Sequence, residues 1–191
     1  ICHCDHTMIR ATAVIDELEL ASHGLHYLEP PANHVHLFHD DSPPWVHFVD
    51  QEATIDGLAA LYPHQVDGYR RYLGDALPVA RLVLDVARTY PSAARLSARA
   101  LSRRGDAAAR LIRWSRLSVD DVLRRYFDDW HLRVPAFSTG PTVWGLPPST
   151  PGTGLAALGY ATRHLVPTGR PRGGSGMLPT ATRASLEAAG G

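Results

Sequence analysis

The sequence predicts an α+β fold in which several helices pack on a small antiparallel sheet. Apolar residues recur at helical spacing over several long stretches, and two strand-like runs flank an Asp- and Pro-containing turn between residues 34 and 49. In addition, 45% of the 191 residues are hydrophobic, which is enough to bury the core of one ordinary domain.

The first elements predicted are a helix, a short strand and a hairpin. Residues 12–20 follow an amphipathic helical pattern, and Gly24 stands where a glycine commonly ends a helix. A short strand is expected over 25–28. The runs 34–39 and 45–49 then predict an antiparallel hairpin with a longer turn, with which one sheet begins.

The middle of the chain is helical in its periodicity. Asp50 is a candidate N-cap for a helix over 51–61, whose apolar positions share one face. From His64 the helical pattern continues, and Pro78 is expected to kink or break that helix.

Two further helix starts are indicated nearer the carboxyl end. Ser118 and Asp121 have the spacing of a capping box, with aspartate in place of glutamate, and open a helix that continues to Phe127. The segment 135–151 is rich in Pro, Gly, Ser and Thr and predicts a loop. A helix over 155–165 is expected to follow it.

Eleven arginines lie between Arg81 and Arg125, against four carboxylates. Such a cluster can bind phosphate groups of lipids or nucleic acid. The alternative is a solvated helix face, because the arginines alternate with apolar residues at helical spacing. The whole chain has 19 basic and 19 acidic residues and no net charge, so no global field favours nucleic acid.

Histidines and cysteines suggest a metal site, but their spacing argues against one. Cys2 and Cys4 are a poor chelate, and His34 and His36 place both rings on one strand face. We therefore expect no metal. The two cysteines are also too close for an easy disulfide, which favours a reducing compartment and a cytoplasmic protein.

A glycine-rich elbow is the most informative motif. Gly173, Gly174, Ser175 and Gly176 precede a run from Met177 with apolar residues at roughly helical spacing. Backbone without Cβ atoms can approach a ligand closely, and a helix amino terminus carries partial positive charge. The elbow is therefore a candidate cofactor contact, and a plain tight loop is the alternative.

The run 169–178, GRPRGGSGML, resembles a segment in the middle of phytoene desaturase-like FAD-dependent oxidoreductases, relatives of the carotenoid desaturases and the amine oxidases. The similarity covers nearly the whole chain. Other stretches agree with that family in the same order along the chain: 9–20, 23–25, 69–73, 140–146 and 151–155.

The resemblance implies an FAD-dependent oxidoreductase that removes or transfers hydride on an apolar substrate, with isoprenoids as one candidate class. It implies that Gly173, Gly174, Ser175 and Gly176 lie near FAD. Trp144, Gly152 and Gly154 are weaker candidates for substrate contact. The chain has no lysine and none of the common hydrolase or phosphate-loop motifs, so no catalytic acid, base or nucleophile is named.

The resemblance also implies a division of the chain. Residues 1–167 correspond to a substrate (cap) domain, and 168–191 to a glycine turn and helix of the FAD-binding core. The family's GxGxxG turn is missing, so we expect a central fragment, inactive alone, that other parts of the same enzyme complete. The competing interpretation is a non-catalytic helical module that binds a membrane surface or a protein partner through its arginine-rich face.

Overall fold

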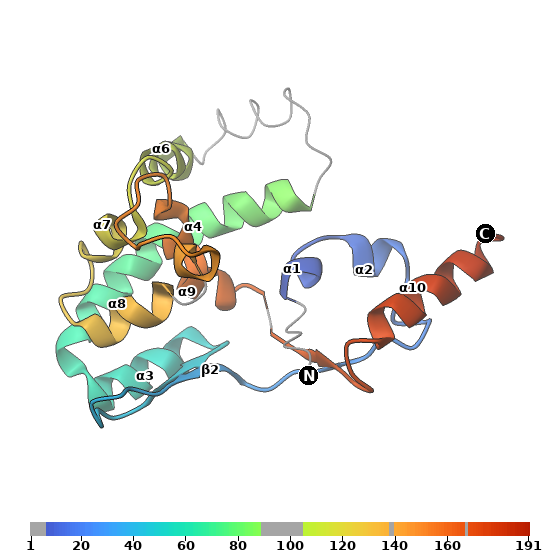
Figure 1. Ribbon diagram of the computed structural model, residues 1–191, viewed down its shortest axis with the longest axis horizontal. Helices are drawn as coiled ribbons and strands as arrows, with labels where there is room; N and C mark the ends of the chain where they lie inside the picture. The colour runs from blue at the N-terminus through green and yellow to red at the C-terminus, as the bar shows by residue number, and fades with distance from the viewer. Residues whose placement is uncertain (1–6, 89–104, 138–139, 167) are drawn as a thin grey trace.

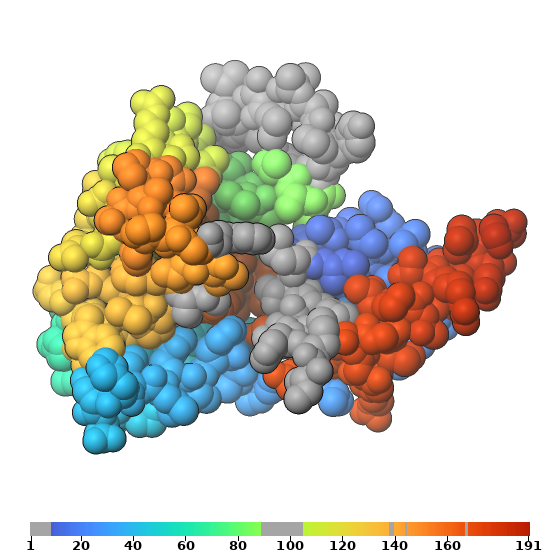
Figure 2. Space-filling view, in the orientation of Figure 1, coloured from blue at the N-terminus to red at the C-terminus, as the bar shows by residue number. Residues whose placement is uncertain are grey.

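Two lobes of unequal size make up the residues that the computed structural model describes, 7–88, 105–137, 140–166 and 168–191 (Figure 1). The larger lobe is mainly helical, and the smaller one joins the first and the last described segments of the chain. In Figure 2 the red C-terminal helix and the blue N-terminal segment form a separate protrusion beside the larger lobe. The fold is mixed, with helices and small antiparallel sheets, as the sequence predicts.

The elements of the larger lobe are β2 (Ala32–His36), β3 (Trp45–Phe48), α3 (Gln51–Leu61), η1 (Pro63–Gln65), α4 (Val66–Ala87), α6 (Gly105–Trp114), α7 (Val119–Leu123), α8 (Trp130–Phe137), η2 (Pro141–Trp144), η3 (Gly154–Leu158) and α9 (Gly159–Arg163). Those of the smaller lobe are α1 (Thr7–Arg10), α2 (Val14–Glu17), β1 (Tyr27–Leu28), β4 (Arg170–Pro171) and α10 (Met177–Ala188).

The predicted hairpin and the helix after it are confirmed. Strands β2 and β3 pair antiparallel, with His34 opposite His47 and His36 opposite Trp45. Helix α3 has the predicted bounds, because the Asp50 carboxylate accepts a hydrogen bond from the Ala53 amide at 2.8 Å and caps its first turn.

Helix α4 runs from Val66 to Ala87 with Pro78 inside it, so of the predicted kink or break at Pro78 the break does not occur. Proline removes one backbone hydrogen bond, but the apolar face of α4 is buried on both sides of it, by Tyr72 and Leu73 before and by Leu82 after. Tertiary packing therefore outweighs the local cost of the proline.

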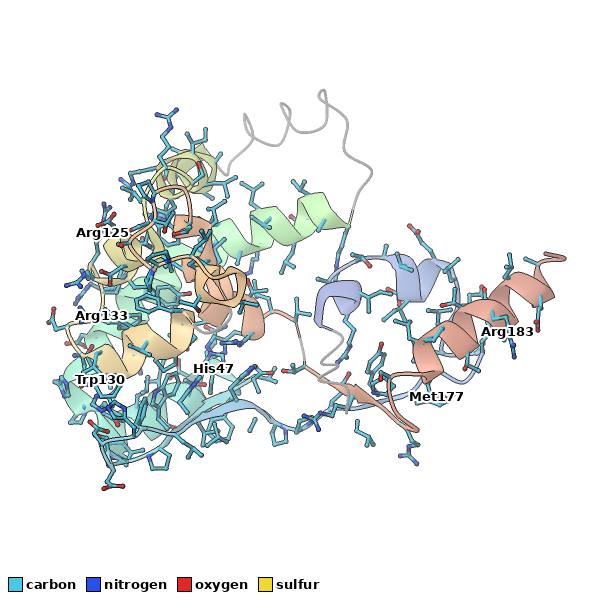
Figure 3. The ribbon with its side chains drawn as sticks, viewed as in Figure 1. His47, Arg125, Trp130, Arg133, Met177 and Arg183 are labelled. Atoms are coloured by element: carbon cyan, nitrogen blue, oxygen red, sulfur yellow. The ribbon has the colours of Figure 1, made fainter. Side chains whose placement is uncertain are left out.

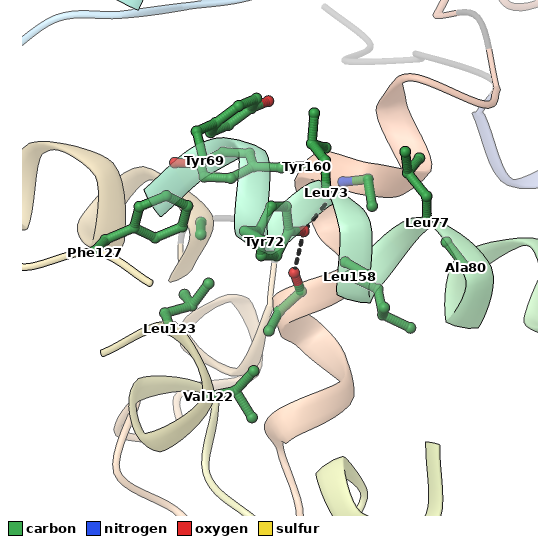
Figure 4. Close-up of a cluster of buried hydrophobic side chains, with 14 of the residues drawn as sticks. Tyr69, Tyr72, Leu73, Leu77, Ala80, Val122, Leu123, Phe127, Leu158 and Tyr160 are labelled. Carbon is green, nitrogen blue, oxygen red and sulfur yellow. Dashed lines mark hydrogen bonds between the residues drawn. The ribbon is translucent and has the colours of Figure 1, made fainter. Parts of the chain in front are cut away.

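The core of the larger lobe is rich in tyrosine, and its hydroxyl groups are paired. Figure 4 shows Tyr72 of α4, which donates to the Ala157 carbonyl at 2.6 Å and accepts from the Ala161 amide at 3.1 Å. Tyr160 donates to the Leu132 carbonyl at 2.7 Å. These bonds tie α4, α8 and the η3–α9 segment together inside an apolar surrounding, where an unpaired hydroxyl is costly.

Some predicted elements are shorter or divided. The helix expected over 12–20 is reduced to α2, because Glu19 adopts a left-handed conformation with φ of 49° and turns the chain inward. The capping box at Ser118 is confirmed, but α7 ends at Leu123. The helix expected over 155–165 is divided into η3 and α9.

The smaller lobe is held by a pairing that the sequence did not indicate. Instead of one sheet, there is a second two-stranded sheet in which β1 pairs with β4, Tyr27 opposite Pro171. Helix α10 packs Ala181 against Leu20 and Leu25, which are all buried. The two ends of the described chain thus share one small apolar cluster.

Candidate functional site

The glycine elbow lies between β4 and α10 and is open to solvent. Gly173 and Gly174 both have φ of +93°, a conformation that suits glycine, and Gly173, Gly174 and Gly176 are exposed. A Cβ atom built on Gly174 or Gly176 would meet nothing within 4 Å. At Gly174 and Gly176 the elbow therefore presents backbone with open space beside it, and the predicted helix follows.

Part of the first helical turn is already hydrogen-bonded within the elbow. The Met177 amide donates to the Gly174 carbonyl at 3.1 Å, and the Leu178 amide donates to the Ser175 carbonyl at 3.3 Å. Those two N–H groups are not free for an anion. The elbow therefore offers a ligand its exposed backbone surface, and not these two N–H groups.

The β1–β4 pair fixes the position of the elbow. The Arg172 amide donates to the His26 carbonyl at 2.8 Å, and the Gly174 amide donates to the Pro171 carbonyl at 2.9 Å. Met177 packs beside the turn, since its Cγ atom would lie 3.1 Å from a Cβ atom on Gly173. In Figure 3 Met177 lies at the start of α10, next to the turn.

A groove of about 580 Å³ lies where the chain passes between the two lobes. Arg10, on the smaller-lobe side, pairs with Glu29 and places its guanidinium 4.5 Å from the centre of the Tyr27 ring. Burial raises the pKa of the Tyr27 hydroxyl, and the charge of Arg10 partly offsets that rise. The groove is lined by Leu28, Glu29, Pro30, Asn33, Thr168, Gly169 and Arg170.

The weaker candidates for substrate contact lie in the larger lobe, away from the elbow (Figure 1). Trp144 ends the short helix η2. The amides of Gly152 and Gly154 both donate to the Leu117 carbonyl, at 3.0 and 2.9 Å. The structure does not bring these three residues together with Gly173–Gly176.

Gly154 has a packing reason to be glycine. A Cβ atom at this position would lie 2.2 Å from the Trp114 carbonyl oxygen and 3.0 Å from that of Leu117. The start of η3 therefore fits against the end of α6 only without a side chain.

Histidines on the hairpin form a group, from half-buried to fully buried, whose packing the sequence did not reveal. The rings of His34 and His36 stack on one strand face, as predicted, with centroids 6.1 Å apart. His47, on the neighbouring strand, is fully buried and points toward the helices (Figure 3). The alternation of His34, His36, Trp45 and His47 could have shown that they share one face of the hairpin.

Burial governs the titration of this group. Burial, and then the charges of Arg163 and His34, lowers the pKa of His36 to about 3. Burial likewise holds the pKa of His47 well below its usual value, with His164 and Arg163 as further causes. Both imidazoles are therefore neutral at physiological pH.

No group of three or more His, Cys, Asp or Glu is arranged to hold a metal ion among the residues that the structure describes. The cysteine-containing segment 1–6 lies outside those residues. The prediction that the chain binds no metal stays a prediction.

The arginine-rich segment is only partly described, because residues 89–104, with four of its eleven arginines, lie outside the described ranges. Of the remaining seven, Arg110 pairs with Asp75 at 2.7 Å and Arg124 pairs with Asp120 at 2.6 Å. Arg125 lies on the same side of the larger lobe as Arg133 and Trp130 (Figure 3). Within the described ranges no helix is both long enough and apolar enough to cross a bilayer.

Comparison of the chain with protein-family models, with curated proteins and with solved structures finds no match.

Proposed function

We propose that this chain is the substrate-side part of an FAD-dependent oxidoreductase resembling phytoene desaturases, and that the backbone of Gly173–Gly176 lies against the flavin. The observation that supports this proposal most directly is the open elbow, where a Cβ atom on Gly174 or Gly176 would meet nothing within 4 Å. When bound, the flavin supplies the redox chemistry by accepting hydride from an apolar substrate, while the protein supplies position and polarity.

The chain's own contribution is to hold the elbow in place from both sides. The β1–β4 pair anchors it on one side, and α10 anchors it on the other through Ala181 in the smaller apolar cluster. These contacts fix the position of the elbow backbone and leave its surface uncovered. A flat ring system can therefore approach the backbone closely. The groove between Leu28 and Arg170 lies on the same β1–β4 unit, and there we place the approach of the substrate.

The proposal assigns residues 168–191 to the FAD-binding core and residues 1–167 to the substrate domain. The packing of Ala181 on Leu20 and Leu25 supports a refinement, in which the start of the chain docks on the same core. The chain offers no GxGxxG turn for the pyrophosphate, so this proposal requires a dinucleotide-binding fold from another part of the enzyme.

The test has two parts. The complete reading frame that contains these residues is expected to encode a strand, a GxGxxG turn and a helix upstream, and its purified product to contain FAD, identified by mass spectrometry after release. The 191-residue chain alone is expected to take up no FAD in a fluorescence titration. A complete product without flavin, and without that upstream motif, would contradict the proposal.

A further inference from the structure

The inner face of the β2–β3 hairpin is made of histidine where an antiparallel sheet usually carries apolar residues. His34 and His36 of β2 and Trp45 and His47 of β3 share this face, in register across the two strands. His47 is fully buried, and its ring stacks on Tyr160 of α9 with centroids 5.5 Å apart. Imidazole rings therefore form part of the contact between the hairpin and the helices, together with the buried Trp45, whose indole N–H donates to the His131 carbonyl.

The surroundings of these rings offer few hydrogen-bond acceptors to a charged imidazole. Among the described residues, neither ring nitrogen of His47 has a hydrogen-bond partner, and neither does Nε2 of His36. A protonated imidazole carries an N–H donor on both nitrogens, so protonation would bury a charge and leave its donors unsatisfied.

The surrounding charges oppose protonation as well. The groups that depress the pKa of His47, after burial, are His164, Arg163, His36 and His34, which are all bases. From α4, Tyr69 contacts His164. Asp50, at the start of α3, favours the charged form of His164, but it is not among the groups acting on His36 or His47. The buried guanidinium of Arg163 would lie close to any new positive charge.

We propose that the β2–β3 hairpin is an acid-sensitive latch, docked on α9 while the inner-face histidines are neutral and released when they take up protons in mildly acidic solution. This inference does not depend on flavin binding.

The direction follows from proton linkage. A histidine in the released hairpin binds a proton near its ordinary pKa of about 6.5, whereas the docked ring resists protonation down to a lower pH. The docked hairpin is therefore fully stable above the ordinary histidine pKa of about 6.5, and its docking weakens as the pH falls below that pKa. Each proton taken up on release lowers the docking equilibrium constant by up to about tenfold per pH unit.

Hydrogen exchange of the 191-residue chain tests the latch. Protection factors, corrected for the intrinsic pH dependence of exchange, are measured for 32–36 and 45–48 between about pH 7.5 and about pH 5. We expect protection in these strands to fall by about tenfold or more relative to α4. A fall that is equal in α4 and the hairpin, or no fall at all, would overturn the latch.

Variants separate the buried rings from other titrating groups. His47→Phe keeps a planar ring and removes one titrating group, so the pH dependence of hairpin protection should become shallower by about one proton. His39→Phe is the control, because His39 lies on the exposed connection between the strands. An unchanged slope in His47→Phe contradicts the proposal.

If His47→Phe does not fold, the wild-type chain still gives an answer. The ring nitrogen shifts of His36 and His47 are followed by NMR across the same pH range. The latch requires both rings to stay neutral while the hairpin is protected and to gain protons only as protection is lost. Rings that titrate near their ordinary pKa with protection intact would refute it.

Discussion

The Tyr69 hydroxyl donates a hydrogen bond to Nε2 of His164 at 2.8 Å, inside the core of the larger lobe. In the neutral ring this direction follows from the other nitrogen, because Nδ1 must carry the proton that it donates to the Val49 carbonyl oxygen, 2.9 Å away, which leaves Nε2 as the acceptor. Burial lowers the pKa of His164 and favours this neutral form, in which both ring nitrogens are hydrogen-bonded. The pair connects α4 with the end of α9 and, through Val49, with the end of the hairpin.

Removing this hydroxyl should destabilise the protein. Tyr69→Phe leaves a buried Nε2 without its donor, and we expect a loss of roughly 1–3 kcal/mol in the free energy of unfolding, measured with urea. Tyr62→Phe is the matched control, because its hydroxyl donates to the carbonyl of Pro43, an exposed residue where water can replace it. Equal losses in the two variants would contradict the assigned role of the Tyr69 hydroxyl.

A methyl group on Gly154 should be costly for steric reasons alone. Gly154→Ala would place Cβ 2.2 Å from the Trp114 carbonyl oxygen, so the backbone must shift, at a cost of roughly 1–3 kcal/mol. Gly74→Ala, in the exposed middle of α4, meets nothing within 4 Å and should stabilise the helix by about 0.5–1 kcal/mol. Thermal unfolding of both variants measures the contrast, and a neutral Gly154→Ala would show that the contact with α6 is looser than described.

Acid should weaken the contact between the hairpin connection and α8. His131 lies 2.6 Å from the Asp129 carboxylate through Nδ1 and 3.2 Å from that of Asp40 through Nε2. Burial by itself would raise the pKa of both carboxyl groups, but the hydrogen bonds, from His131 to both and from Ser42 to Asp40, together hold it below the usual value.

A carboxyl group whose pKa is lower in the folded protein than in the unfolded chain stabilises the fold. This stabilisation is complete above the unfolded pKa of about 3.9, and it is lost as the pH falls through the lower pKa of the folded protein. Asp129→Asn should therefore remove part of the fall in Tm that the wild type shows in this acid range. Asp128→Asn, an exposed neighbour, serves as control and should keep the wild-type profile. Identical profiles for all three proteins would rule out the contribution of Asp129.

Local signals made much of the fold predictable. Helix α3 was found with its bounds because Asp50 caps it and its apolar residues share a face. The hairpin and the glycine turn before α10 followed in the same way from neighbouring residues. In each case the information lies within a few positions of the element that it specifies.

Long-range packing produced the features that could not be predicted. Strand β4 is only Arg170–Pro171, too short to carry an alternating pattern, and it exists because it pairs with Tyr27–Leu28 from the other end of the chain. Helix α4 passes through Pro78 because its buried face outweighs one lost hydrogen bond. The depth of His47 depends on α9, which lies far along the chain.

The candidate site was predictable as an elbow and a helix. Its openness depends on how the rest of the chain folds around it, and no local pattern reports that. The glycine pattern does not report that the amides of Gly152 and Gly154 both donate to the Leu117 carbonyl, or that Gly154 packs against the Trp114 carbonyl.

The most direct test of the flavin proposal is the FAD content of a Gly176→Val variant of the complete reading-frame product. Gly176 has φ of −62°, and a Cβ atom there meets nothing within 4 Å, so valine should leave the fold intact and alter only access to the elbow. Gly57→Val, in α3 and equally unobstructed, is the control. The account predicts about one FAD per chain in the wild type and in Gly57→Val, and a marked loss in Gly176→Val at unchanged Tm. Full FAD content in Gly176→Val would contradict it.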